Sequence, residues 1–188
     1  MTQPTTDPRL QQALDYMRYQ GAKSLPDLAA LMERTATDWQ RCLEGMTEEQ
    51  ADFKPAVPTG PAGEDEWCPR EVVAHLITTN RSLNQDIAGM AGIEAPAPAE
   101  PVRAMGVVGK DEASRTIADL RERVALVFSE NARLAGSLEE GEKLNQEFPH
   151  PGFGPLKLKE WIAFYRVHGM DHVQQIDTIK ADPAYPKG

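Results

Sequence analysis

The sequence has only two cysteines, Cys42 and Cys68, and they are too far apart to form a Cys-x-x-Cys unit. So few cysteines give no disulfide framework, which is typical of a protein from a reducing compartment. The N-terminal residues lack the basic and apolar segments of a signal peptide, and no apolar run reaches membrane-spanning length. We therefore expect a cytoplasmic protein with no membrane partner.

Clusters of basic residues are also missing. The chain carries 20 Lys and Arg against 29 Asp and Glu, a formal net charge of -9. Nucleic-acid phosphates and anionic membrane surfaces repel such a chain, so we expect no nucleic-acid partner. Its 188 residues are enough for one domain with a sizeable core. We expect a single domain over residues 1–188, with residues 1–7 disordered.

The hydrophobic pattern is helical almost throughout, and no segment has a convincing strand pattern. Apolar residues recur at intervals of three and four, which predicts a short helix near residues 10–17 and long helices near 24–46, 67–90, 111–138 and 157–179. A loop rich in proline and glycine, residues 53–66, separates the first two long helices. Residues 92–101 are too rich in proline for a helix and predict an extended crossover. The fold class is therefore all-α, a four-helix bundle with a long crossover between helices 2 and 3.

Two of the four histidines, His168 and His172, are four residues apart in the last predicted helix. This spacing puts both imidazoles on one helical face, within the predicted buried stripe. His75, on another long helix, follows Val72 by three residues and so points inward or just off the helical seam. A metal ion would satisfy such buried imidazoles together, and three imidazoles with an open position make a reactive centre. A lone inward histidine is more often a hydrogen-bonded core residue, so spacing alone leaves both readings open.

Three motifs occur in order along the chain: Trp67-Cys-Pro-Arg-Glu-Val-Val-Ala-His75-Leu, Pro149-His-Pro-Gly-Phe-Gly-Pro-Leu-Lys-Leu-Lys-Glu160-Trp161, and His168-x-x-x-His172-x-x-Gln175-Ile176. With these motifs, nearly the whole chain resembles the DinB/YfiT superfamily of metalloenzymes. The resemblance implies an up-down-down-up bundle that forms a homodimer. It also implies one divalent metal ion, nickel or zinc, held by His75, His168 and His172.

The same resemblance implies a small-molecule substrate. Some relatives are thiol-dependent transferases or isomerases that use bacillithiol or mycothiol, and others are called metal-dependent hydrolases. A low-molecular-weight thiol is therefore a candidate partner. The sequence departs from the family at Gly169, where relatives often carry Glu, and at Cys68, where Ser or Thr is more usual. Neither change removes a metal ligand.

The chemistry of the three histidines limits the catalytic group. Neutral imidazoles do not compensate the charge of a divalent ion, and three of them leave a coordination position open. Water in that position has its pKa lowered to about 7, and a thiolate could bind there instead. We therefore expect metal-bound water or a thiolate as the reactive species. The glutamate of His-Glu-x-x-His is absent. Asp171 adjoins His172 but points about 100° away around the helix. It is therefore a weak catalytic candidate, and a solvated carboxylate is the favoured interpretation.

Several other polar residues have roles that the sequence leaves open. Gln174 and Gln175 can hold a ligand histidine by hydrogen bonds. His150 belongs to a glycine- and proline-rich turn before the last helix, where we expect a structural role. Cys68 stands at a helix start, where a lowered pKa is the alternative to simple packing.

Two functions follow from these patterns. The first is an enzyme whose three-histidine metal site catalyses hydrolysis or thiol-dependent transfer on a small molecule. The alternative is a non-catalytic bundle with a structural metal or a ligand-binding pocket. A structural site is normally closed by a fourth protein ligand. No fourth ligand is evident on the predicted helical faces, which favours the open, reactive site.

Overall fold

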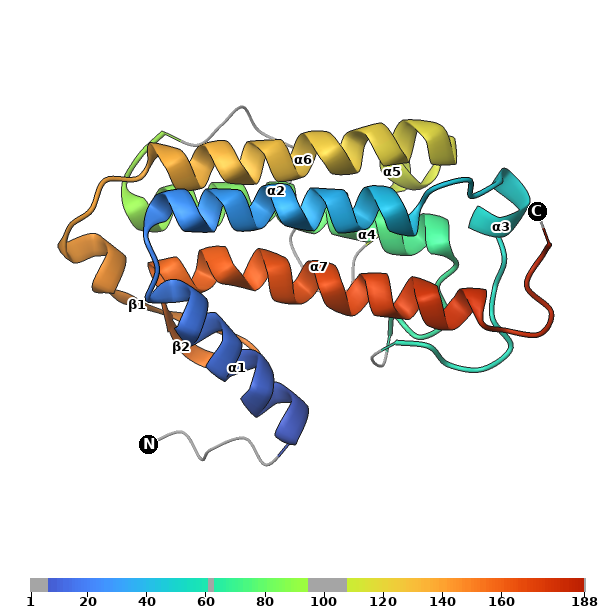
Figure 1. The fold of residues 1–188 in the computed structure, drawn as a ribbon, viewed down its shortest axis with the longest axis horizontal. Coiled ribbons are helices and arrows are strands. Elements are labelled where there is room, and N and C mark those ends of the chain that lie inside the picture. Colours follow the sequence, from blue (N-terminus) through green and yellow to red (C-terminus); the bar gives the residue numbers. More distant parts are fainter. Residues whose placement is uncertain (1–6, 61–62, 95–107, 188) are drawn as a thin grey trace.

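The computed structural model describes residues 7–60, 63–94 and 108–187. Four long helices form the bundle: α2 (Leu25–Cys42), α4 (Pro69–Ala91), α6 (Ile117–Ser137) and α7 (Leu158–Lys180). Each of α2 and α4 packs against both α6 and α7, so the four enclose one core (Figure 1). The shorter α1 (Pro8–Gly21) packs against α7 from outside. The predicted four-helix bundle is confirmed.

The helices run up, down, down and up. The C-terminal ends of α2 and α7 meet where the Lys180 ammonium donates to the Cys42 carbonyl, so these two helices run in the same direction. Figure 1 shows α4 and α6 running the opposite way, one after the other. The parallel run of α4 and α6, between α2 and α7 in the chain, gives the up-down-down-up order that was predicted.

Local signals in the sequence set several helix ends. Ser24 is the N-cap of α2, and its hydroxyl accepts from the Asp27 backbone N–H at 3.3 Å while the Asp27 carboxylate accepts from the Ser24 N–H. Such reciprocal bonds satisfy donors that the first helical turn leaves free. Pro69 opens α4, where its missing N–H costs nothing. Gly92 ends α4 with φ 69°, a conformation that favours glycine.

The third long helix differs from the prediction. Instead of one helix over residues 111–138, a single turn, α5 (Lys110–Ala113), is followed by a break and then by α6. Thr116 causes the restart, because its hydroxyl accepts from the Asp119 backbone N–H at 3.1 Å. A threonine in this role ends one helical segment and caps the next. The apolar periodicity continued across this break and concealed it.

The expectation of no strand is wrong for one short hairpin. Strand β1 (Glu147–His150) pairs antiparallel with β2 (Gly154–Lys157), and Pro149 lies opposite Pro155. Four residues are too few to show an alternating pattern, and proline disfavours a strand because it lacks an N–H. The sequence therefore indicated only a turn here. The short helix α3 (Glu48–Ala51) and the 3-10 helix η1 (Glu142–Asn145) were also not anticipated.

Two predictions fall wholly or largely outside the described residues. The disordered stretch was placed at residues 1–7, of which 1–6 are not described; Asp7, by contrast, caps α1 by accepting from the Arg9 N–H at 2.8 Å. The crossover over residues 92–101 is described only as far as residue 94. In the part of the chain that is described, no helix has both the length and the apolar character to cross a membrane.

Candidate metal centre

The structure brings three histidines from two facing helices to one point. Nε2 of His168 lies 3.2 Å from Nε2 of His75 on α4 and 3.0 Å from Nε2 of His172, one turn further along α7. One nitrogen of each ring lies within 4.8 Å of those of the other two. The helical spacing of four aligned the α7 pair, and the antiparallel packing of α4 on α7 added His75.

Aromatic rings hold these imidazoles in place. The Trp67 ring lies against His75, with centroids 4.8 Å apart, and it also faces His172. Phe164 stacks on His168 at 5.5 Å, with the planes 19° apart. His75 and His172 are buried, whereas His168 is partly exposed. Aromatic rings therefore pack against the cluster, and His168 is its most exposed member.

Gln175 fixes the orientation of one ring. Nδ1–H of His172 donates to Oε1 of Gln175 at 2.9 Å, which leaves the Nε2 lone pair facing the other histidines. Nε2 of Gln175 donates in turn to the backbone carbonyl of Glu64 at 2.7 Å. Gly60 lies so close that a Cβ there would be 2.5 Å from the Gln175 amide nitrogen. Of the two candidate glutamines, Gln175 contacts the site and Gln174 is exposed.

The imidazoles of the α7 pair are neutral at pH 7. Burial, followed by the charge of nearby His75, lowers the pKa of His172 to about 4. Burial and the two neighbouring imidazoles lower the pKa of His168 well below its usual value. Among the described residues, Nδ1 of His168 has no hydrogen-bond partner. The neutral α7 pair therefore has ring nitrogens that can act as ligands, and a cation bound where the three Nε2 atoms converge would be stabilised by them.

Sequence reasoning missed one residue of this site, Glu64. Its Oε1 lies 3.9 Å from Nε2 of His75, and its Oε2 lies 3.9 Å from Nε2 of His172. The side chain is only 14% exposed, and burial raises its pKa. Glu64 belongs to the loop before α4, so a search of helical faces could not find it. The glycine and proline content of that loop was the only signal that it could fold back over the bundle.

The donor set fits a divalent metal ion. Three imidazole nitrogens suit zinc, nickel, copper or iron, and the nearby carboxylate supplies negative charge. All three nitrogens are presented by helices, so the site needs little reorganisation to accept an ion. Residues that could hold it are His75, His168 and His172, with Glu64 beside them.

Asp171, the weak catalytic candidate, is not brought to the histidines. It is exposed on α7, and no described hydrogen bond or ion pair joins it to the three rings. Gly169, the departure from the family pattern, faces the core, where a Cβ would lie 3.1 Å from Thr35 Cγ2 and 3.3 Å from Phe128 Cζ. A glutamate would not fit there in this protein. Cys68 is buried, and burial raises its pKa to about 11, which favours a packing role over a reactive thiolate.

His150 lies apart from the cluster and stabilises the hairpin. Its Nδ1 accepts from the backbone N–H groups of Gly152 and Phe153, at 3.1 and 3.2 Å. Its ring contacts Trp161 and Phe164, with centroids 4.7 and 4.6 Å away. Burial lowers its pKa to about 4. The expected structural role is what the contacts show, and through Phe164 the hairpin also supports His168.

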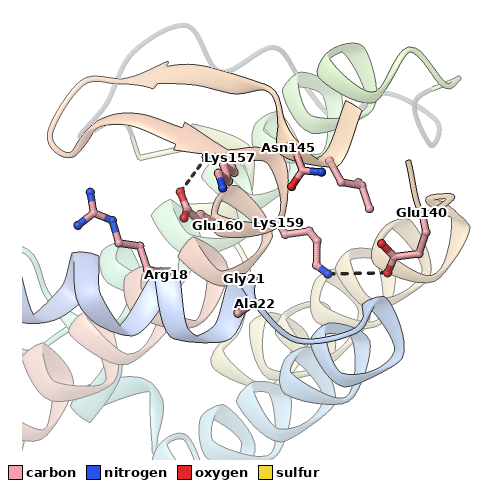
Figure 2. Close-up of a pocket in the computed structure, with 9 residues that line it drawn as sticks. Arg18, Gly21, Ala22, Glu140, Asn145, Lys157, Lys159 and Glu160 are labelled. Atoms are coloured by element: carbon pink, nitrogen blue, oxygen red, sulfur yellow. Dashed lines mark hydrogen bonds and ion pairs between the residues drawn. The ribbon is translucent and has the colours of Figure 1, made fainter. Parts of the chain in front are cut away.

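A separate pocket lies where α1, η1 and the start of α7 meet (Figure 2). Its volume is about 240 Å³, and its lining carries charges of both signs. Lys159 lies 3.7 Å from Glu140, and Glu160 accepts from the Lys157 backbone N–H at 2.8 Å. None of the histidines lines this pocket, so it does not belong to the candidate metal centre.

Helical bundles are a class of protein that builds metal sites from inward side chains on facing helices, and the three histidines have this arrangement. Residues 7–176 match the family model of the DinB superfamily. This match covers most of the chain, and the chain belongs to that superfamily.

Two relatives support the assignment. YfiT from Bacillus subtilis, described as a probable metal-dependent hydrolase with an unusual four-helix bundle topology, superposes with a TM-score of 0.61. The superposition covers 98% of this chain and 95% of YfiT at 16% sequence identity, which shows a shared fold. The uncharacterized protein YuaE from Bacillus subtilis (strain 168) is 26% identical, over 73% of this chain and 88% of YuaE.

Proposed function

We propose that this protein is a metal-dependent hydrolase of a small molecule, with a divalent ion held by His75, His168 and His172. The convergence of their three Nε2 atoms, at 3.0 and 3.2 Å from the shared His168 nitrogen, carries the proposal. The description of YfiT as a probable metal-dependent hydrolase agrees with this chemistry.

Each residue of the site has a definable task. A bound divalent ion would supply a Lewis acid and activate water near neutral pH. His172 is held in the ligand tautomer by Gln175, and His168 is held in orientation by Phe164. Trp67 covers His75 and restricts water on that side. The partly exposed edge of His168 is the side from which a substrate would approach.

Metal analysis of the purified protein tests the proposal first. We expect about one divalent ion per chain, lost on His168→Ala while helicity is retained. Asp171→Asn is the control, because Asp171 is exposed on the same helix and should leave both metal and activity unchanged. A wild-type protein that retains no divalent ion after loading with zinc or nickel would refute the proposal.

A substrate screen tests the reaction. The metal-loaded protein is assayed on ester and amide panels, and in parallel on electrophiles with several low-molecular-weight thiols. Ester or amide cleavage that disappears in His168→Ala supports the hydrolase. Thiol conjugation without cleavage would contradict it and favour the transferase that the family resemblance also allows. Elemental analysis of the same preparation identifies the native ion, which we expect to be nickel or zinc. The mass in solution tests the predicted homodimer.

A further inference from the structure

The Glu64 carboxylate is nearly enclosed and has no cation against it. Its side chain is 14% exposed, and the groups beside its oxygens are Nε2 of His75 and of His172, each 3.9 Å away. Among the described residues, no lysine or arginine forms an ion pair with Glu64, and no hydrogen bond to its carboxylate is found. An enclosed carboxylate without such partners is costly, because it has lost water and gained nothing in exchange.

The three imidazoles bring their Nε2 atoms together beside this carboxylate. Their Nε2 atoms converge, with His168 at 3.2 Å from His75 and 3.0 Å from His172. Nδ1–H of His172 donates to Gln175, so its Nε2 carries a lone pair. The Nε2 lone pair of His172 and the Glu64 oxygens are acceptors that face each other across 3.9 Å. One cation between them would satisfy both groups.

We propose that Glu64 is the fourth ligand of the metal ion, completing a three-histidine, one-carboxylate set. The inference rests on the proposed function, since it requires the ion held by His75, His168 and His172. Each Glu64 oxygen lies equally far from a different histidine, so the carboxylate spans the side of the cluster that His75 and His172 form. It also halves the charge that a divalent ion would bring into this enclosed site.

Glu64 is the exchangeable member of the set. The histidines are carried by α4 and α7, and their rings are held by Trp67 and Phe164. Glu64 lies on a loop, and the contact that holds it is made through its backbone carbonyl, which accepts from Gln175 at 2.7 Å. The carboxylate can therefore rotate away while the loop stays in place. Its departure opens a coordination position, so a closed resting site becomes a reactive one.

Metal binding to the full chain tests the ligand role. Co²⁺ and Zn²⁺ affinities are measured for wild type, Glu64→Gln and Glu64→Asp, with Glu66→Gln as the matched control, since Glu66 is an exposed glutamate on the same loop. We expect Glu64→Gln to weaken Zn²⁺ binding by about 100-fold or more. Loss of a residue that only orients a ligand weakens metal binding by about 10- to 100-fold. The visible spectrum of the Co²⁺ protein should change in Glu64→Gln and not in Glu66→Gln.

Thermal stability gives a second test, in which the effect of Glu64→Gln should change sign with the metal. Without metal, removing an uncompensated carboxylate should raise the thermal unfolding midpoint of Glu64→Gln above that of wild type by about 2–4 °C. With Zn²⁺ bound, the midpoint of Glu64→Gln should lie below that of wild type. If Glu64 only paired with a protonated histidine, the metal-free variant would be destabilised instead, which would overturn the proposal. Glu64→Asp keeps the charge on a shorter side chain, so we expect intermediate Zn²⁺ affinity.

Azide tests the exchange. In the Co²⁺ wild type, azide should displace the carboxylate and shift the spectrum, and it should bind about 10-fold more tightly to Glu64→Gln, where no carboxylate competes. Equal metal affinity in wild type and Glu64→Gln would reject the ligand role while leaving the three-histidine hydrolase intact. A wild-type spectrum that azide does not alter would reject exchange. Failure of the wild type to bind Co²⁺ or Zn²⁺ would instead reject the proposed function itself.

Discussion

Gln175 accepts a hydrogen bond at 2.9 Å from Nδ1 of His172, three residues before it on α7. The same amide donates to the Glu64 carbonyl, so one side chain joins a candidate ligand to the loop that covers it. A histidine ligand whose second nitrogen is held in this way keeps its tautomer and its orientation. The Gln175 amide therefore couples the geometry of the site to the position of the loop.

Replacing Gln175 tests this coupling. Gln175→Met removes both hydrogen bonds and keeps the side-chain length, so we expect metal affinity to fall by about 10- to 100-fold. Competition with a chromophoric chelator measures the change. Gln174→Met is the control, because Gln174 is exposed on the same helix. Equal losses in the two variants would show that the effect is general to the helix and not specific to Gln175.

Gly169→Glu introduces the residue that relatives often carry. The Gly169 position faces Thr35, Phe128 and Trp39, with no room for a longer side chain and no cation among these neighbours. We expect the free energy of unfolding to fall by about 3 kcal/mol or more, measured by urea unfolding. Gly89→Glu is the control, since a Cβ at Gly89 meets nothing within 4 Å. A stable, folded Gly169→Glu protein would contradict the packing described for α7.

Two buried asparagines should respond oppositely to leucine. Both side-chain polar atoms of Asn131 lack partners in a fully buried position, so Asn131→Leu should stabilise the fold by about 1–3 kcal/mol. Oδ1 of Asn84 accepts from the Tyr165 hydroxyl at 2.6 Å. Asn84→Leu should destabilise by a similar amount, because it leaves that hydroxyl unpaired. Chemical denaturation of both variants measures the contrast, and destabilisation by Asn131→Leu would indicate a buried water on its amide.

His150 should make stability depend on pH. Burial lowers its pKa from 6.5 to about 4, so between these values the unfolded chain binds a proton that the folded chain does not. The free energy of unfolding should therefore fall as pH drops through this window, by up to about 3 kcal/mol in total. His168 and His172, whose pKa values are also lowered, contribute in the same sense, so the His150 share is the difference from His150→Phe. Urea unfolding of the metal-free proteins at pH 7 and pH 5 measures it; parallel losses in both proteins would contradict the assignment.

The helices of this protein and the faces that carry its histidines could be read from local patterns. The spacing of His168 and His172 and the apolar stripe around them depend only on the period of one helix. The N-cap at Ser24 and the proline that opens α4, Pro69, are equally local signals, since each involves residues within one turn. The hairpin at Glu147–Lys157 escaped detection because its strands are short and contain prolines.

The sequence by itself determined the four-helix bundle and the inward direction of His75, His168 and His172, because helical periodicity decides which side chains share a face. Only the tertiary structure decided which groups meet there. Glu64 reaches His75 and His172 from the loop before α4, and Gln175 holds that loop from α7. Glu64 is far from His172 and Gln175 in the sequence, 111 positions from Gln175, so no local pattern encodes these contacts. They follow from how α4 packs against α7 and from where the loop is held.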